Sequence, residues 1–299
     1  MKALRILVIR HVKIFFKDKG IFFTSLIAPL ILLFLFVVFL GDVYRDSFLS
    51  VLPEGTVLPG RAVDGFAGAW LMSSQLAVCC VTVAFCANMQ LVQDKVTGVV
   101  GDFIITPCRQ SWLALSYFLA TALITASICA VALGVGFVYL AFVGWFLSAA
   151  DIFLILLDVI VMSLFGTALS SLVCFFLKSQ GGITAVSVIV SSVYGFLCGA
   201  YMPISQFAVG IQKFISLLPG TYGTGLFRNH FMRGVLQESA QYLPAEAIRS
   251  VRDAFDCNLY FFGNRVSTCT MFLVIGLTLV LFTGAYIALN AFSRRVKTK

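Results

Sequence analysis

One acidic side chain lies inside a long apolar stretch and is the first candidate for chemistry. Asp158 falls near one end of an apolar run that extends to Leu177. A carboxylate in the middle of a membrane helix costs about 2.5–3.5 kcal/mol, so this residue needs a physical reason. The acid either faces a cavity, where it meets a cationic substrate or a proton, or it hydrogen-bonds to a neighbouring helix or stays hydrated near the interface. No Lys or Arg lies in the apolar runs to complete a proton relay.

A row of small polar side chains gives the second pattern. Thr184, Ser187, Ser191 and Tyr194 recur at steps of three and four residues, so they share one face of a helix that Cys198 continues. Small and hydroxyl-bearing side chains let helices approach closely and bond across their interface. The row indicates either packing within the subunit or a face at a dimer seam that also lines a transport path.

No catalytic or metal-binding motif accompanies these residues. The sequence has no G-x-x-x-x-G-K-[ST] loop, no G-x-S-x-G elbow and no H-E-x-x-H pair. Its nine cysteines form no C-x-x-C pair and no Cys/His cluster, so no metal site is predicted. Free thiols are expected, with an external disulfide from Cys257 as the alternative. If the chain moves anything uphill, the energy must come from another subunit or from an ion gradient.

The composition places the chain in a membrane. Its 299 residues are 60% hydrophobic and only 11% charged, with a mean hydropathy of +1.01, whereas a soluble domain carries about 25% charged residues. A helix needs about 20 apolar residues to cross the hydrocarbon core. Six windows free of Asp, Glu, Lys and Arg approach or exceed that length: Gly20–Gly41, Gly65–Gln93, Gln110–Ala150, Val159–Leu177, Ser179–Gln212 and Val266–Ser293.

The prediction is therefore an all-α polytopic membrane protein with six transmembrane helices. The fourth span starts earlier than its window, at Ile152, and includes Asp158. The third window is read as one long helix followed by a loop around Trp145, because a seventh span would put the basic tail opposite the basic head.

Basic residues gather on one side of these spans. They come from the head, the tail and the loops after spans two and four: Lys2, Arg5, Arg10, Lys13, Lys17, Lys19, Arg294, Arg295, Lys297, Lys299, Lys95, Arg109 and Lys178. The positive-inside rule then predicts that both termini are cytoplasmic. This asymmetry accounts for the net charge of +8 without a nucleic-acid partner.

The basic head, residues 1–19, is also amphipathic. Its apolar side chains recur at helical spacing with cations between them: Leu4, Leu7, Val8, Val12, Phe15 and Phe16. This pattern predicts a helix lying at the cytoplasmic interface, with its Lys and Arg near anionic headgroups. A plain basic flank that only sets topology is the alternative. The remaining residues, 20–299, are expected to form one transmembrane domain.

The segment from Gln93 to Gln110 interrupts two charge-free runs. It carries the adjacent charges Asp94 and Lys95, two glycines, a further acid and a Thr-Pro stop. Because the chain on both sides is buried in the membrane, the segment must lie on one membrane surface. It is too short for a domain, so it is interpreted as a docking element.

The segment after span five is broken by proline and glycine. Pro203 and Pro219-Gly220 flank an apolar helical face made by Phe207, Ile211, Phe214, Ile215 and Leu218. Irregular backbone at membrane depth is tolerated only where it is buried in protein or lines a cavity. The segment 203–265 is therefore predicted to be a re-entrant hairpin entering from outside, followed by a small external subdomain over about 229–264.

Together these features resemble the permease subunits of ABC-2 type exporters. The resemblance covers nearly the whole chain and rests on three pieces. They are the amphipathic head leading into a span with Pro29; Asp94, Lys95, Gly98, Phe103 and Thr106-Pro107 after span two; and Gly199-Ala200-Tyr201-Met202-Pro203 with Pro219, Tyr222 and Arg228. Asp94 stands where Glu is commoner, and Ala208 stands where a second proline often sits.

The resemblance implies a non-enzymatic transport subunit in the plasma membrane, and a bacterial origin is part of the same expectation. Two copies would form the path, each docked on a separate ATPase subunit that binds ATP and Mg, while this chain binds no cofactor. The implied coupling residues are Asp94, Lys95, Gly98, Asp102, Phe103, Thr106 and Pro107. The implied external gate comprises Pro203, Pro219, Tyr222 and Arg228. The expected substrate is hydrophobic and drug-like or lipid-like; a lipid-linked glycan, a peptide or toxin, or an ion-coupled carrier function are the alternatives.

Overall fold

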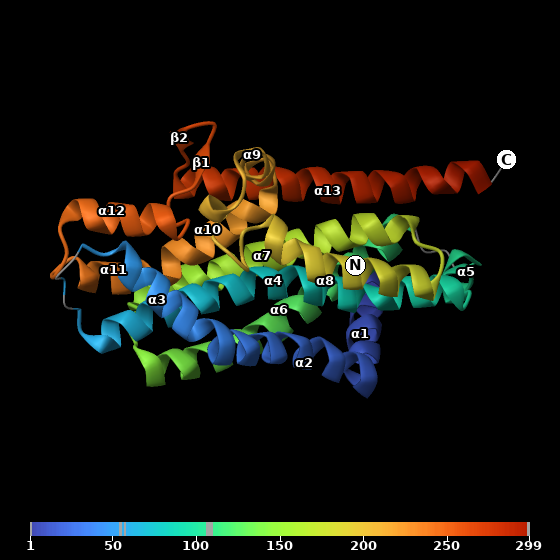
Figure 1. Cartoon of the computed structure of the whole chain (residues 1–299). Helices are drawn as coiled ribbons and strands as arrows, with labels where there is room; N and C mark the ends of the chain where they lie inside the picture. Colours follow the sequence, from blue (N-terminus) through green and yellow to red (C-terminus); the bar gives the residue numbers. More distant parts are fainter. Residues whose placement is uncertain (1, 54–55, 57, 106–109, 298–299) are drawn as a thin grey trace.

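The computed structural model describes residues 2–53, 56, 58–105 and 110–297 of the chain. Within these ranges the protein is helical apart from one two-stranded hairpin, and six helical segments are long and apolar enough to cross a membrane. The six spans predicted from the sequence are thus confirmed. Most of them run along one long axis of the molecule (Figure 1).

The spanning segments take their bounds from the apolar windows. They are α2–η1–α3 (Lys19–Leu35, Phe36–Leu40 and Gly41–Val51), α4 (Gly60–Val96), α6 (Gln110–Val143), α7 (Ala149–Phe176), α8 (Gln180–Leu197) and α13 (Thr268–Lys297). The other elements are α1 (Lys2–Lys17), α5 (Val99–Ile105), η2 (Ile204–Gln206), α9 (Val209–Ser216), α10 (Pro219–Phe231), α11 (Arg233–Ser239), α12 (Ala245–Ala254), β1 (Tyr260–Phe261) and β2 (Asn264–Arg265).

The observed helix boundaries can be compared with the predicted spans. The third window is one helix, α6, followed by a loop at Trp145, and α7 contains Asp158 as expected. The first span continues ten residues beyond its predicted end at Gly41, and Tyr44 and Phe48 of this extension are buried against α4. The predicted subdomain over about 229–264 begins within the last turn of α10, which extends to Phe231.

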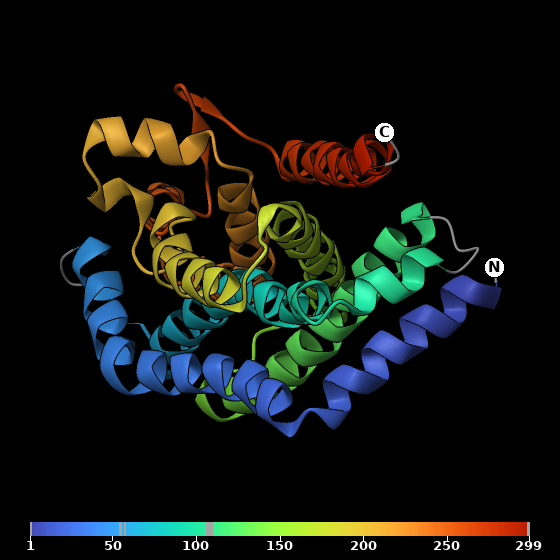
Figure 2. The ribbon, with the colours of Figure 1, turned by 90° about the vertical axis from the view of Figure 1, so that its right-hand side faces the viewer.

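Helix α4 forms the centre of the molecule. Of its 37 residues, 28 are buried, and it contacts α2, α3, α6, α7, α8 and α10. The view along the long axis shows these helices around it (Figure 2). Helix α7 approaches α4 very closely at Gly166, where an added Cβ would lie 2.5 Å from the Cys80 carbonyl oxygen. A small residue at this crossing therefore sets the distance between the two spans.

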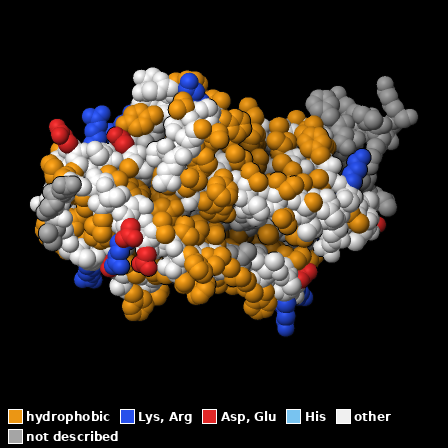
Figure 3. All heavy atoms as spheres, viewed as in Figure 1, with side chains coloured by type: hydrophobic (Ala, Val, Ile, Leu, Met, Phe, Trp, Pro, Cys, Tyr) orange, Lys and Arg blue, Asp and Glu red, His pale blue; other side chains and the backbone are white. Residues whose placement is uncertain are grey.

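The outer spans present apolar side chains to their surroundings. Phe34 and Phe39 on the first span, and Val280 on α13, are more than 60% exposed. Figure 3 shows hydrophobic side chains across the middle of one face, with most of its charged side chains toward the two ends. That distribution suits a protein surrounded by lipid, because only apolar side chains are compatible with the hydrocarbon core.

The two ends of the molecule differ in their elements. Helix α5, helix α1 and the last turns of α13 lie toward one end, called here the α5 end (Figures 1 and 2). The opposite end, called here the α12 end, carries α11, α12 and the β-hairpin (Figure 1). Helix α1 packs against α6 and crosses the spans rather than running along them (Figures 1 and 2).

Candidate functional site

A tight turn after α4 creates the short surface helix α5. The backbone of Gly98 has φ of +82°, a left-handed conformation that favours glycine at the end of a helix. The Gly98 carbonyl then accepts a hydrogen bond from the Gly101 N–H at 2.7 Å, which opens α5. The exposed Asp102 lies on this helix. The predicted coupling residues Thr106 and Pro107 lie outside the described residues.

Asp94 ties this turn to two other helices. Its Oδ2 accepts hydrogen bonds from Arg10 of α1 at 3.0 Å and from the hydroxyl of Tyr117 on α6 at 2.5 Å. The Arg10 guanidinium also lies 5.1 Å from the ring centroid of Phe103 on α5. One arginine of the basic head thus bridges the acid at the end of α4 and the aromatic ring of the surface helix.

Lys95 holds the same turn from the opposite direction. Its Nζ donates to the carbonyl oxygens of Cys174 and Phe175 at 2.9 and 3.1 Å, at the end of α7. A lysine at these last carbonyls also interacts favourably with the negative end of the helix dipole. The two adjacent charges therefore contact different neighbours, and together they connect α5 to α1, α6 and α7.

His11 completes this cluster from α1. Its ring stacks on Tyr117 with centroids 3.9 Å apart, and its Nε2 lies 3.3 Å from the Ser116 hydroxyl. Burial, with the neighbouring Arg10 charge as the second cause, lowers the pKa of His11 from 6.5 to about 4. His11 is therefore neutral at physiological pH. Arg10, one of the cations of the predicted amphipathic head, pairs with Asp94 beside it.

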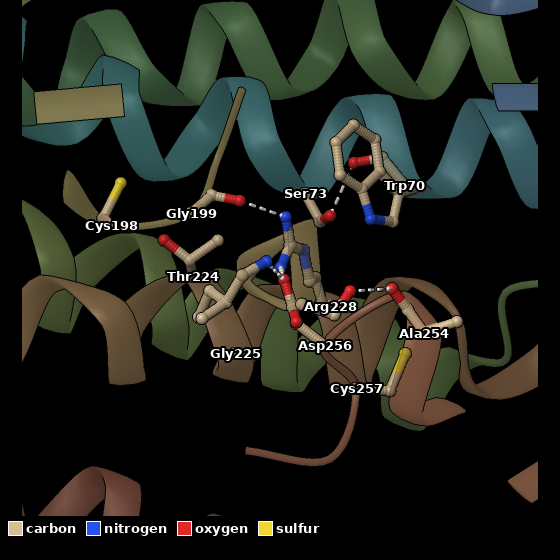
Figure 4. Close-up of polar contacts among 12 residues, drawn as sticks. Trp70, Ser73, Cys198, Gly199, Thr224, Gly225, Arg228, Ala254, Asp256 and Cys257 are labelled. Carbon is tan, nitrogen blue, oxygen red and sulfur yellow. Dashed lines mark hydrogen bonds and ion pairs between the residues drawn. The ribbon is translucent and has the colours of Figure 1, made fainter. Parts of the chain in front are cut away.

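Arg228 and Asp256 form a second buried polar cluster, whose contacts are drawn in Figure 4. Arg228 of α10 donates to Asp256 at 2.7 Å and to the Gly199 carbonyl at 2.5 Å. Its guanidinium lies 4.8 Å from the Trp70 ring centroid on α4. Asp256 also accepts from the Ile204 N–H at 2.8 Å. Arg228 therefore joins α4, α10 and the segments that follow α8 and α12.

Two of the other predicted gate residues lie on the same helix as Arg228, and the third lies before η2. Pro203 is buried directly before η2, and Pro219 is the first residue of α10, where its missing N–H costs no hydrogen bond. The Tyr222 hydroxyl donates to the Ser216 carbonyl at 2.6 Å, which links α10 to α9. Eleven of the 13 residues of α10 are buried. The sequence offered no periodic signal for Asp256, the acid that fixes Arg228.

Asp158 has a partner that the sequence did not predict. Its Oδ2 lies 2.5 Å from Nδ1 of His230 on α10, and the acid is fully buried. The geometry matches an acid that hydrogen-bonds to a neighbouring helix. No Lys or Arg is needed for that contact, which explains why a search for cationic partners missed it.

The polar row on α8 faces mainly inward. Ser187 is buried, Ser191 and Tyr194 are partly buried, and Thr184 is exposed. The Ser191 carbonyl accepts a hydrogen bond from the Tyr201 hydroxyl at 3.1 Å. Three of the four side chains in the row are thus at least partly covered within the subunit.

Comparison with known families agrees with this architecture. The model of the family described as ABC-2 type transporter matches residues 2–232, from α1 to the end of α10. No curated protein matches the chain. The matched residues include Asp94, Lys95 and Arg228. The chain therefore belongs to the ABC-2 type transporter family, as a membrane permease component without ATPase activity of its own.

Proposed function

We propose that this chain is the transmembrane permease of an ATP-driven exporter and docks a separate ATPase subunit through α5. The observation that carries the proposal is the set of contacts around Asp94, which joins several helices beside α5. Asp94, Arg10 and Phe103 bring α4, α1 and α5 to one point, and Lys95 adds the end of α7. A force applied to α5 by a partner would therefore reach four helices.

Each predicted coupling residue is given a role according to whether its side chain is bonded within the protein or exposed. Asp94, Lys95 and Gly98 position α5, because the first two are bonded within the protein and the third forms the turn. Asp102 is exposed on α5 and is assigned to the ATPase contact. The same contact includes Phe103, with Thr106 and Pro107 following it in the sequence. ATP and Mg would be bound by the ATPase, as ABC-2 permeases work with ABC ATPase subunits.

The transport path is proposed to need two copies of the chain. Pro203, Pro219, Tyr222 and Arg228 would form the external gate, with α9 and α10 as a re-entrant pair. Support comes from the burial of α10 among α4, α7 and α13, the protein environment that irregular backbone requires at membrane depth. The topology proposed places the α5 end in the cytoplasm of a bacterial cell, with residues 1–19 at the interface and 20–299 as the transmembrane domain.

A hydrophobic drug-like or lipid-like molecule is the proposed substrate. The spans contribute mostly apolar side chains, and a lipid-linked glycan or a peptide would require a more polar path. Thr184, Ser187, Ser191 and Tyr194 remain candidates for that path or for the dimer seam. Export of the candidate substrates from vesicles containing the purified complex would separate these classes.

The decisive experiment is affinity purification of the tagged full chain from its own membranes, with mass spectrometry of the partners. We expect a stoichiometric protein with a phosphate-binding G-x-x-x-x-G-K-[ST] loop. Asp102→Ala should reduce its recovery without changing the stability of the chain, since Asp102 is exposed. Asp94→Ala with Lys95→Ala should abolish recovery. The matched control is Asp46→Ala with Lys213→Ala, which removes an exposed acid and an exposed lysine elsewhere.

An ion-coupled carrier is the second candidate, favoured by the buried Asp158–His230 contact. Protonatable groups inside a membrane protein mark proton pathways in many transporters. Asp158→Asn should then abolish transport while the chain stays folded and no ATPase is recovered. Unchanged substrate range and stability in Asp158→Asn would remove this candidate.

A further inference from the structure

A large cavity lies at the α5 end, between the ends of four spans. Its volume is about 910 Å³, which is within the range of small-molecule sites. Leu91 and Lys95 of α4, Tyr117 of α6, Phe175 of α7 and Tyr286 of α13 contribute to its walls. Gly98 and Gly101 place the turn and α5 at its edge. Because all four spans end here, the cavity lies where a membrane interface would be.

The cavity has cations and no acid among its described lining residues. Lys95 and Lys178 both line it, while its other described walls are apolar or uncharged. The nearest acid in sequence, Asp94, is already bonded to Arg10 and Tyr117. No described acidic side chain forms an ion pair with Lys178, which is exposed. The electrostatics therefore favour an anion.

The walls favour an anion that also has an apolar part. Phe175, Phe176 and Leu177 line the cavity beside Lys178, and Phe176 is 63% exposed. Leu91 and Leu113 line it as well. A free phosphate would use only the two ammonium groups and leave this apolar surface in water, whereas burying apolar surface is favourable. Basic pockets between transmembrane helices can hold anionic lipid headgroups.

We propose that this cavity binds an anionic phospholipid, with its phosphate at Lys95 and Lys178 and an acyl chain against Phe175, Phe176 and Leu177. The Lys95 ammonium keeps its two carbonyl partners, because an ammonium group has three donors and only two are used. The site goes beyond the proposed transport role. It needs neither an ATPase nor a transported substrate.

The test uses the full chain in vesicles of phosphatidylcholine and phosphatidylglycerol, with a photoreactive phosphatidylglycerol as the probe. We expect crosslinks in the peptides of α6 and α7 that carry Tyr117 and Phe175. Unlabelled phosphatidylglycerol should compete and phosphatidylcholine should not. Equal competition by the two lipids would overturn the anionic site. Competition by inorganic phosphate would overturn the lipid and leave a free-phosphate site.

Two variants test the two parts of the ligand. Lys178→Gln should reduce crosslinking about fivefold, the factor corresponding to the ~1 kcal/mol of one Lys near an anionic surface. Phe176→Ser should also reduce it, which a phosphate bound alone would not show. Lys17→Gln is the matched control, because it removes an exposed lysine of α1 that does not line the cavity. Unchanged crosslinking in Lys178→Gln would overturn the proposal.

These results are independent of the proposed function. Lys178→Gln changes no residue assigned to ATPase coupling or to the gate. If the unchanged chain recovers the ATPase but gives no competable lipid crosslink, the lipid site alone is wrong. If it gives the crosslink but recovers no ATPase, the proposed function alone is wrong.

Discussion

Arg228 and Asp256 form an ion pair whose side chains are only 1% and 6% exposed. Neither charge can be removed alone without leaving the other buried and unpaired. The pair also orders backbone, since Gly199 and Ile204 each bond to one of its members. A residue assigned to a gate by family resemblance is thus also a structural tie between elements distant in sequence.

Arg228→Met should destabilise the chain by about 3–5 kcal/mol, the usual cost of removing one partner of a buried pair. Combining it with Asp256→Asn should recover part of that loss, because the asparagine is neutral and its carbonyl still accepts from Ile204. Thermal unfolding of both variants in the same detergent measures the difference. Equal destabilisation by the single and double variants would show that the charge of Asp256 is not what costs stability.

His11 gives a prediction about pH. The pKa of His11 is lowered to about 4 in the folded chain and has its ordinary value of 6.5 in the unfolded chain. Between these two pH values the unfolded chain binds a proton at His11 and the folded chain does not. Folding stability from this group is therefore complete above about pH 6.5 and declines as pH falls toward 4. The groups facing His11 are Arg10, Asp94 and Tyr117.

The chain has only two histidines, so NMR of selectively labelled imidazoles can test this directly. The signal of His11, assigned with a His230→Gln variant, should stay neutral until the pH approaches 4. A midpoint near 6.5 would instead mean that α1 does not dock on α6 as the structure places it.

At the scale of elements, the crossing of α4 and α7 depends on one small residue. Gly166→Ala would place a Cβ 2.5 Å from the Cys80 carbonyl oxygen. Separation of the helices should cost about 1–3 kcal/mol, as overpacking typically does. Gly276→Ala on α13 is the control, because nothing lies within 4 Å of its added Cβ. A lower unfolding temperature for Gly166→Ala alone is expected; equal effects would contradict the close crossing.

The α4–α5 turn is a second element whose geometry can be tested. Alanine at Gly98 would have to adopt φ of +82°, at a cost of about 1–2 kcal/mol. Gly98→Ala should therefore lower ATP-dependent transport and recovery of the ATPase. Gly101→Ala lies within α5 in open space and should leave both unchanged. If the two variants behaved identically, the left-handed turn at Gly98 would not be required for coupling to the ATPase.

At the scale of the whole molecule, the charge asymmetry predicts the orientation. Lys17 and Lys213 are exposed lysines of α1 and α9, on elements that the proposed topology assigns to opposite membrane sides. A thiol reagent that cannot cross membranes should label Lys213→Cys in intact cells and Lys17→Cys only after permeabilisation. Labelling is measured against the unchanged chain, whose own cysteines give the background. The reverse pattern would invert the topology.

The class of the protein and its spans could be read from the sequence. Hydropathy and helix length act locally, so six apolar windows determined six membrane helices, and the motif order determined the family. The single long α6 and the inclusion of Asp158 in α7 followed from the same reasoning. The extension of the first span did not, because it accompanies tertiary packing of Tyr44 and Phe48 in α3 against α4.

The partners of the buried polar groups came only from the tertiary structure. Arg10 and Asp94 are 84 residues apart in sequence, and His230 and Asp158 are 72 apart. A desolvated charge must find a partner, which the sequence alone can predict. Which partner it finds depends on the rotation and depth of each helix against its neighbours, and those are set by packing around α4. The sequence therefore determined that these groups needed contacts, and only the fold decided with whom.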